Sequence, residues 1–218
     1  IRDDLVTGVQ TCALPIFLVE VKAVSVNPVD YKVRNSTPPA DGDWKVLGWD
    51  AAGIVREVGP DVTQFELGDE VYYAGSITRP GTNAEFHLVD ARIVGHKPAS
   101  LSWAEAAALP LTTLTAWEAM FDRLDVAKPV PGAAEAILII GGAGGVGSIA
   151  VQIARQRTDL TVIATASRPE TQEWVRGLGA HHVIDHSRPL APQIAELGIG
   201  APAFVFSTTH TEQHEIGR

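Results

Sequence analysis

The 218-residue sequence lacks several features that mark particular classes of protein. Its single cysteine, Cys12, excludes an intramolecular disulfide and leaves too few thiolates for a structural zinc site. Lys and Arg number 17 against 26 Asp and Glu, the formal net charge is -9, and no basic cluster occurs, which disfavours nucleic acid and anionic membranes as partners. No apolar run reaches the roughly 18 residues of a membrane span. We therefore expect a cytoplasmic protein that acts on a small molecule.

Both ends of the sequence are unusual. Residues 6–16, VTGVQTCALPI, resemble the conceptual translation of a sequencing-library adaptor, and residues 215–218, EIGR, resemble the start of the opposite adaptor. On this interpretation residues 1–16 and 215–218 are not native, and the remainder is a fragment of a longer protein. A natural tail at each end is the alternative.

The first part of the remainder has the pattern of a β domain. Apolar and polar residues alternate over residues 17–25, which predicts a half-buried strand, and residues 46–98 continue as short β-like pieces separated by glycines. A compact β-barrel is expected. Ser102 and Glu105 form a capping-box signal for a helix over residues 103–109, and a second helix is expected over 113–124. The turn-forming segment KPVPG, residues 128–132, predicts a domain boundary, so that the first domain covers 17–130.

The second part, residues 131–214, has a different hydrophobic pattern. Continuous apolar runs without alternation are typical of parallel strands that are buried on both faces. Helical periodicity separates the runs, and strands that alternate with helices indicate a doubly wound parallel sheet. Strands are expected at residues 136–140, 161–166, 182–185 and 203–207, with helices after 147, over 169–178 and around 190–197.

A glycine motif follows the first of these strands. Gly142, Gly144 and Gly147 read G-x-G-x-x-G at the opening of a helix, which is the context that a dinucleotide-binding loop requires. The first glycine permits a tight turn, the second lets the backbone approach a pyrophosphate, and the third lets helix and strand pack closely. The helix N-terminus offers N–H groups to the phosphates. A merely flexible loop is the alternative. The predicted cofactor-binding residues are Gly142, Ala143, Gly144, Gly145, Val146 and Gly147.

The end of the second parallel strand indicates which cofactor is bound. An acidic residue there would hold a ribose hydroxyl and select NADH, but residues 165–168 read TASR. Ser167 and Arg168 would instead bind a 2′-phosphate through charge-assisted hydrogen bonds, so NADPH is predicted. Two alternatives stay open: Arg168 is a solvated loop residue, or the nearby Glu170 allows NADH.

Six segments together resemble the medium-chain dehydrogenase/reductase superfamily, in its zinc-type alcohol dehydrogenase-like branch close to the quinone oxidoreductases. They are NPVDYKVR (27–34), GWDAAGIVREVG (48–59), GDEVYYAG (68–75), ALPLTTLTAWEAM (108–120), GGAGGVGSIAVQIAR (141–155) and LGAHHVID (178–185). The resemblance implies an α/β protein in which a GroES-like β-barrel catalytic domain precedes a Rossmann domain. The Rossmann domain is truncated here, with four expected strands where the family has six. For the full-length protein the resemblance implies a homodimer.

The resemblance also bears on metal binding. The three catalytic zinc ligands of the family's alcohol dehydrogenases match Asn27, Trp49 and Leu111, and none of these side chains suits zinc. The hydroxyl that relays the alcohol proton matches Val29. We therefore expect no metal site.

Zinc-free relatives reduce activated double bonds, so the resemblance implies an NADPH-dependent oxidoreductase that transfers hydride to a quinone, an enone or a related activated carbonyl compound. It implies that Asn27 donates its amide to the substrate, that Thr115 approaches the nicotinamide, and that Tyr31 is the nearest proton donor. Trp49 would wall the substrate pocket. Simple structural roles are the alternatives: a turn cap for Asn27 and packing for Tyr31 and Trp49. The alternative functions are a zinc-type alcohol dehydrogenase and a non-catalytic NADPH-binding protein.

Overall fold

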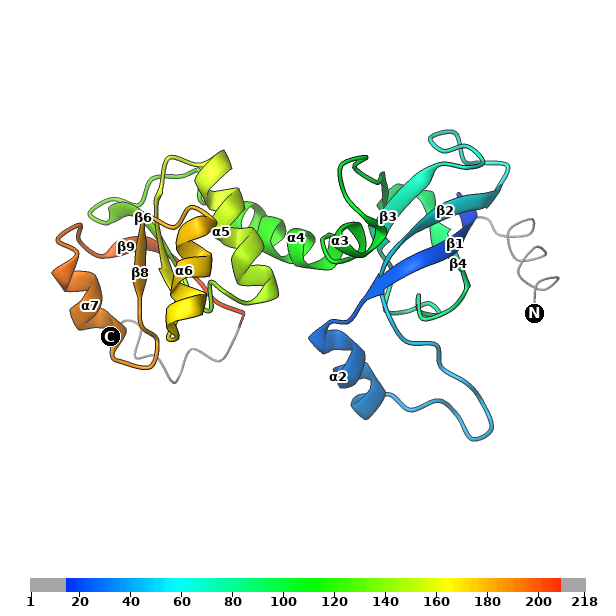
Figure 1. The fold of residues 1–218 in the computed structure, drawn as a ribbon, viewed down its shortest axis with the longest axis horizontal. Helices are drawn as coiled ribbons and strands as arrows, with labels where there is room; N and C mark the ends of the chain where they lie inside the picture. The colour runs from blue at the N-terminus through cyan, green and yellow to red at the C-terminus, as the bar shows by residue number, and fades with distance from the viewer. Residues whose placement is uncertain (1–14, 209–218) are drawn as a thin grey trace. The chain divides into compact units, whose positions relative to one another are not determined.

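The computed structural model of the protein describes residues 15–208, and its contacts divide the chain into two compact units, Ile1–Leu111 and Thr112–Arg218 (Figure 1). Each unit has its own sheet and its own core. Among residues 15–208 we find no helix that is both long enough and apolar enough to cross a bilayer.

The first unit is built on a five-stranded antiparallel sheet with the order β4-β1-β2-β3-β5. The strand expected over 17–25 is confirmed, because β1 pairs with β2 on one side and β4 on the other; its first four residues are all buried, and burial alternates only over residues 21–25. The inward faces surround one apolar core, as the barrel prediction requires. The strands are β1 (Ile16–Ser25), β2 (Asp50–Val58), β3 (Glu70–Ala74), β4 (Phe86–Asp90) and β5 (Val94–His96).

Strand β1 begins inside the segment that was expected to be non-native. Ile16 is buried, pairs with Asp90, and accepts a hydrogen bond from the Gly59 N–H at 3.0 Å. The Pro15 carbonyl likewise accepts from the Ala91 N–H at 2.8 Å. Residues 1–14 and 215–218, and with them most of that interpretation, lie outside the described residues.

The helices of the first unit include one that the sequence analysis missed. The capping box before α3 (Trp103–Ala107) is confirmed, with Ser102 Oγ accepting from the Glu105 N–H at 3.3 Å. A short 3-10 helix, η1 (Ala91–Ile93), precedes β5. The missed helix is α2 (Pro28–Ser36), whose N-cap is Asn27. Its start is fixed because proline is favoured in the first helical turn and the Asp30 carboxylate accepts from the Asn27 N–H at 2.6 Å.

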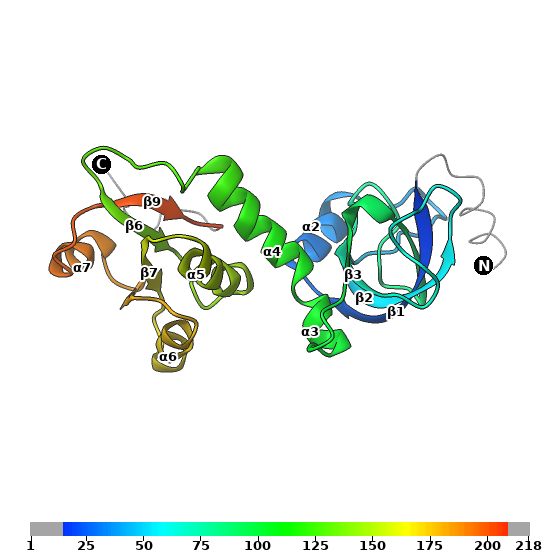
Figure 2. The same cartoon turned by 90° about the horizontal axis from the view of Figure 1, so that it is seen from above.

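The second unit contains a four-stranded parallel sheet with the order β8-β7-β6-β9. Helices α5 and α7 lie on opposite sides of it (Figure 2), which confirms the doubly wound expectation. The strands are β6 (Ala134–Ile139), β7 (Thr161–Thr165), β8 (His182–Ile184) and β9 (Pro202–Phe206), and the helices are α5 (Gly145–Arg157), α6 (Pro169–Gly177) and α7 (Leu190–Glu196).

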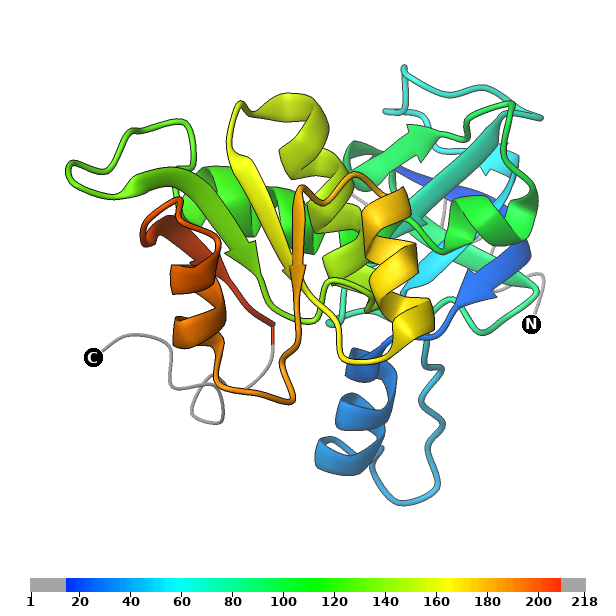
Figure 3. The same ribbon diagram turned by 60° about the vertical axis from the view of Figure 1, so that its left-hand side comes forward.

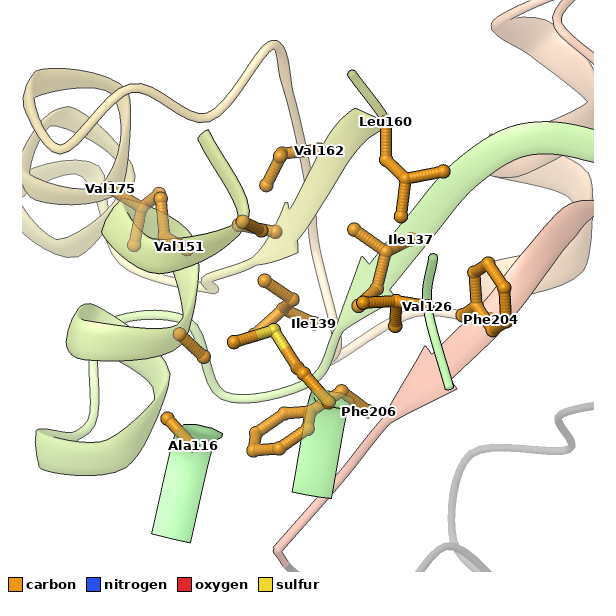
Figure 4. Close-up of a cluster of buried hydrophobic side chains, with 14 of the residues drawn as sticks. Ala116, Val126, Ile137, Ile139, Val151, Leu160, Val162, Val175, Phe204 and Phe206 are labelled. Carbon is orange, nitrogen blue, oxygen red and sulfur yellow. The ribbon is translucent and has the colours of Figure 1, made fainter. Parts of the chain in front are cut away.

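Strand β6 shows why its sequence is continuously apolar. Ile137 and Ile139 point into one core, shared with α5, α6 and β9 (Figure 4), whereas Leu138 points into the core beneath α7. All three side chains are fully buried. A strand with two buried faces cannot alternate between apolar and polar residues.

The boundary between the units lies earlier than residues 128–132. Helix α4 (Pro110–Trp117) continues into a π-helix, η2 (Glu118–Arg123), where a single α-helix was expected over 113–124. Ala116, Met120 and Val126 are buried in the core of the second unit. Because these side chains pack with the second sheet, the division falls after Leu111.

Candidate functional site

The glycine loop joins β6 to α5 at the C-terminal edge of the parallel sheet, where β6, β7 and β8 end on the same side (Figure 3). Gly144 is the N-cap of α5, and Gly144 and Gly145 are exposed. The first N–H groups of a helix have no intrahelical partner and carry its positive dipole end. The loop therefore presents backbone donors to solvent and fits a pyrophosphate.

Each glycine of the loop has its own physical reason. The tight turn is made by Gly141, with φ +70°, and not by Gly142 as expected. At Gly142 an added Cβ would lie 2.9 Å from Ala164 Cβ and 3.2 Å from Val175 Cγ1, so close packing requires this glycine. At Gly147 it would collide with the Gly141 carbonyl oxygen. Gly147 thus allows α5 to approach the backbone of the loop, where a close approach of helix and strand was expected.

Gly144 differs from the other glycines of the loop because it faces open space. A Cβ at this position would meet only the Gly141 carbonyl oxygen, at 3.3 Å. Ala143 and Val146, which are also in the predicted set, pack partly against the core of the second unit. Among the predicted residues of the loop, Gly144 and Gly145 are therefore the exposed ones, and the Gly144 N–H already donates to the Gly141 carbonyl at 2.9 Å.

Thr165, at the end of β7, holds the loop in place and was not singled out from the sequence. Its buried Oγ1 accepts from the Gly141 N–H at 2.9 Å, and its carbonyl accepts from the Gly142 N–H at 3.0 Å. The same Oγ1 lies 3.1 Å from His186 Nδ1, at the end of β8. A threonine at the end of the neighbouring strand is the sequence signal that could have identified this support.

Ser167 and Arg168 lie where the sequence places them, between β7 and α6. Ser167 is half-buried, and Arg168 is the N-cap residue of α6. Arg168 Nε is 3.2 Å from Glu170 Oε1, and the two side chains are 71% and 68% exposed. The guanidinium is thus accessible at the sheet edge that carries the glycine loop, and it already has a carboxylate partner.

Helix α6 is also tied to the first turn of α5. Trp174 Nε1 donates to Ser148 Oγ at 2.9 Å, and Ser148 Oγ donates to the Gly142 carbonyl at 3.4 Å. Together with the contact between Gly142 and Val175, this hydrogen-bond chain fixes α6 beside the glycine loop.

Thr115 belongs to the same unit as the loop. It is half-buried on α4, one turn after Thr112, whose Cγ2 lies 3.5 Å from where a Cβ on Gly145 would be. Residues three apart on a helix share a face. The second unit therefore contains every predicted cofactor-binding residue together with Thr115.

The other predicted residues belong to the first unit, where a buried polar cluster surrounds Asp50. Asn27 Nδ2 donates to Asp50 Oδ2 at 2.7 Å, and the Leu111 N–H donates to Asp50 Oδ1 at 2.9 Å. Asn27 is 7% exposed and Asp50 is fully buried. One amide hydrogen of Asn27 is therefore already used, in a hydrogen bond that sequence reasoning did not anticipate.

The environment of Asp50 disfavours its charged form. Burial raises the pKa of Asp50 to about 6, the hydrogen bonds from Asn27 and Leu111 lower it, and the nearby charge of Asp30 raises it. Asp30 is itself 8% exposed, and its Oδ1 has no hydrogen-bond partner among the described residues. The first unit therefore keeps two carboxyl groups out of water, which is costly without cations.

Trp49 and Tyr31 differ sharply in exposure. Trp49 is 1% exposed, and its indole Nε1 donates to the Ser76 carbonyl at 3.0 Å, as expected of a packed core aromatic. Tyr31 lies on α2 and is 56% exposed, so its phenol is accessible and the packing alternative does not describe it.

The residues that match zinc ligands offer no suitable donor atoms. The Asn27 amide nitrogen and the Trp49 indole nitrogen both donate hydrogen bonds, and Leu111 contributes only a backbone N–H to this cluster. Zinc prefers thiolate, imidazole and carboxylate ligands, so this donor set does not fit it. Over residues 15–208 no group of three His, Cys, Asp or Glu side chains could hold a metal ion.

Two family models match the chain. The family described as "Alcohol dehydrogenase GroES-like domain" matches residues 16–117, and the family described as "Zinc-binding dehydrogenase" matches residues 145–213. A zinc-type alcohol dehydrogenase-like protein of Staphylococcus aureus is 47% identical over 196 residues, which is 89% of this chain and 58% of the relative. The tomato 2-methylene-furan-3-one reductase is 36% identical, over 78% of this chain and 45% of the relative.

Solved structures agree with these matches. A Rhizobium etli protein assigned provisionally to the zinc-dependent alcohol dehydrogenases is 82% identical, with a TM-score of 0.89 over 91% of this chain and 58% of its own. The quinone oxidoreductase of Escherichia coli, solved with NADPH, is 30% identical with a TM-score of 0.68, over 86% of this chain and 56% of its own. The chain therefore spans less than two thirds of the length of these relatives.

Proposed function

Because the chain belongs to the medium-chain dehydrogenase/reductase superfamily, we propose that the protein is an NADPH-dependent oxidoreductase that transfers hydride to a quinone, an enone or a related activated carbonyl compound without zinc. One observation carries the cofactor part of the proposal. The exposed start of α5 and the accessible Arg168 guanidinium lie at the same edge of one sheet, and residues 165–168 contain no carboxylate.

The second unit would hold the adenosine and pyrophosphate of the cofactor. The Gly145 backbone N–H, at the exposed start of α5, would bind the pyrophosphate, and Ser167 with Arg168 would bind the 2′-phosphate. When bound, NADPH supplies a hydride from its nicotinamide ring. Thr115 is proposed to contact the nicotinamide, since α4 brings its face beside the start of α5.

Without zinc, hydrogen-bond donors must stabilise the negative charge that develops on the substrate oxygen. Asn27 is proposed for this role through the amide hydrogen that does not bind Asp50. The hydrogen bond to Asp50 would orient the Asn27 amide. Tyr31, with its exposed phenol, is the proposed proton donor.

The test uses the complete protein and follows the loss of NADPH absorbance with quinones, enones, aldehydes and ketones, beside metal analysis of the same sample. We expect turnover of quinones or enones, faster with NADPH than with NADH, and no stoichiometric zinc. Zinc-dependent alcohol oxidation would support a zinc-type alcohol dehydrogenase instead. Tight NADPH binding without any turnover would support a non-catalytic NADPH-binding protein. If Arg168→Ala leaves the preference for NADPH over NADH unchanged, the assignment of that residue is wrong.

A further inference from the structure

We propose that Glu170 is a specificity-determining residue of the cofactor site, because it competes with the cofactor's 2′-phosphate for the Arg168 guanidinium. The inference rests on the proposed function and deepens it. Its basis is the ion pair between Arg168 Nε and Glu170 Oε1, 3.2 Å apart, at the edge of the sheet that carries the glycine loop.

The backbone around this pair is fixed, so its side chains are the parts free to respond to a ligand. Pro169 separates the two residues and occupies the first turn of α6. Thr171 Oγ1 accepts from the Arg168 N–H at 3.2 Å and donates to the Arg168 carbonyl at 2.8 Å. The Arg168 N–H and the Arg168 carbonyl are therefore both held by hydrogen bonds to Thr171.

The ion pair is weak enough to be exchanged. Both side chains are more than two-thirds exposed, and ion pairs in water contribute little because each charge is well solvated. A phosphate carries more charge than a carboxylate, and its oxygens match the planar guanidinium fork. An incoming 2′-phosphate therefore replaces Glu170 as the partner of Arg168.

The displaced carboxylate still affects the affinity. Its negative charge remains within side-chain reach of the phosphate and opposes its binding. A carboxylate just beyond the second strand is also the group that accepts hydrogen bonds from ribose hydroxyls in NADH-binding sites. Glu170 thus lowers the affinity for a 2′-phosphorylated ligand and favours the unphosphorylated one. It therefore reduces the preference for NADPH over NADH that Arg168 creates.

The anchoring of α6 confines the effect of Glu170 to the 2′ position of the ligand. Helix α6 is anchored to the glycine loop by the Trp174–Ser148 hydrogen bond and by the contact of Val175 with Gly142. Neither Arg168 nor Glu170 takes part in that anchor. Removing the Glu170 charge is therefore expected to change recognition at the 2′ position and to leave pyrophosphate binding intact.

Calorimetric titration of the 218-residue chain with 2′,5′-ADP and with 5′-ADP tests the inference, because both probes contain the adenosine of the cofactor, only the first carries a 2′-phosphate, and neither contains the nicotinamide. Glu170→Gln keeps the side-chain shape and removes the charge. We expect it to tighten 2′,5′-ADP binding by about five-fold and to leave 5′-ADP binding equal or up to about two-fold weaker, as befits an exposed pair. In an Arg168→Ala background, the gain in 2′,5′-ADP affinity should fall by at least half.

Glu173→Gln is the matched control, since Glu173 lies exposed on the same helix and the substitution removes the same charge. It should change the ratio of the two affinities by less than Glu170→Gln does. Equal effects of the two substitutions would overturn the inference while leaving the proposed function standing. Failure of the unmodified chain to bind either probe would overturn the proposed function, and the inference with it.

Discussion

The two units place their polar groups in opposite ways. Of the polar residues with buried side chains among residues 15–208, five belong to the first unit and one to the second. The first unit has Asn27, Asp30, Asp50, Thr82 and His87, and the second has Thr165. Apart from the exposed Tyr31, the candidate site of the first unit is thus assembled from buried side chains that are distant in sequence. The glycine loop of the second unit is made of backbone at a helix start and is supported by the Thr165 hydroxyl.

This difference has a chemical consequence. Buried carboxyl groups make the first unit sensitive to pH, because the protonation of a buried acid is linked to stability. A loop built from glycine backbone does not titrate, and it is sensitive to added volume instead. The following four experiments use that contrast, from the largest expected effect to the smallest.

Asp50 should make the first unit less stable as the pH rises. Its pKa in the folded state is about 6, against 3.8 ordinarily, so the folded state binds the proton more tightly between these values. The contribution of Asp50 to stability therefore falls as the pH rises from about 4 to about 6. Relative to Asp50→Asn, the unmodified chain should lose about 2.4 kcal/mol of unfolding free energy between pH 4 and pH 7.

Chemical denaturation of the two proteins at each pH measures this loss. Asp61→Asn, at an exposed aspartate of the same unit, controls for the loss of one carboxylate. If the difference in unfolding free energy between the unmodified chain and Asp50→Asn stays constant with pH, Asp50 does not make the first unit sensitive to pH.

Gly147→Ala should damage the second unit through volume alone. The new methyl group would collide with the Gly141 carbonyl oxygen, so helix and loop must separate, at a cost of about 2 kcal/mol. Binding of 5′-ADP should weaken in parallel. Gly177→Ala, on α6 with nothing within 4 Å of its Cβ, should be neutral or slightly stabilising. Equal unfolding curves for the two variants would contradict the packing argument.

Thr165→Val tests the one buried polar side chain that the second unit has within residues 112–208. It leaves the Gly141 N–H without its acceptor, which should cost about 1 to 2 kcal/mol and speed hydrogen exchange at that amide. Thr161→Val, at the other end of β7, is the control, since Thr161 is only half-buried. Unchanged exchange at Gly141 in Thr165→Val would show that the loop does not depend on this hydroxyl.

Ser102→Ala removes the side-chain cap at the start of α3, in the first unit. The N-cap hydrogen bond to Glu105 is lost, and the first unit should lose about 1 kcal/mol. Ser102→Thr keeps the hydroxyl and should restore most of the stability, measured by thermal unfolding. A loss as large in Ser102→Thr as in Ser102→Ala would point to packing at this position and not to capping.

The contrast between the units also explains how much the sequence could predict. The four parallel strands and the glycine loop depend on neighbouring residues, and both were predictable. Helix α2 was missed because Asn27-Pro28 also reads as a turn. The hydrogen bond between Asn27 and Asp50 joins residues 23 positions apart on different elements, which no local pattern encodes.

Roles within a correctly predicted motif were harder to assign. Gly141 makes the tight turn, because the positive φ lies one residue before the motif begins. Gly142 is instead required by close packing. Trp49 was given two equal interpretations, and its burial became evident only from contacts with residues of another loop, such as Ser76. The ion pair between Arg168 and Glu170 depends on side-chain conformations at a helix start, which sequence spacing alone does not fix.

The hydrogen bond from Leu111 to Asp50 connects the last residue of the first unit with its sheet. All five strands of the first unit have been made once residue 96 is added, but the backbone donor for the buried Asp50 carboxylate comes 61 residues after Asp50 itself. A chain that ends between residues 96 and 111 would therefore keep all the strands described for the first unit and lack one of the hydrogen-bond donors of the buried Asp50 carboxylate.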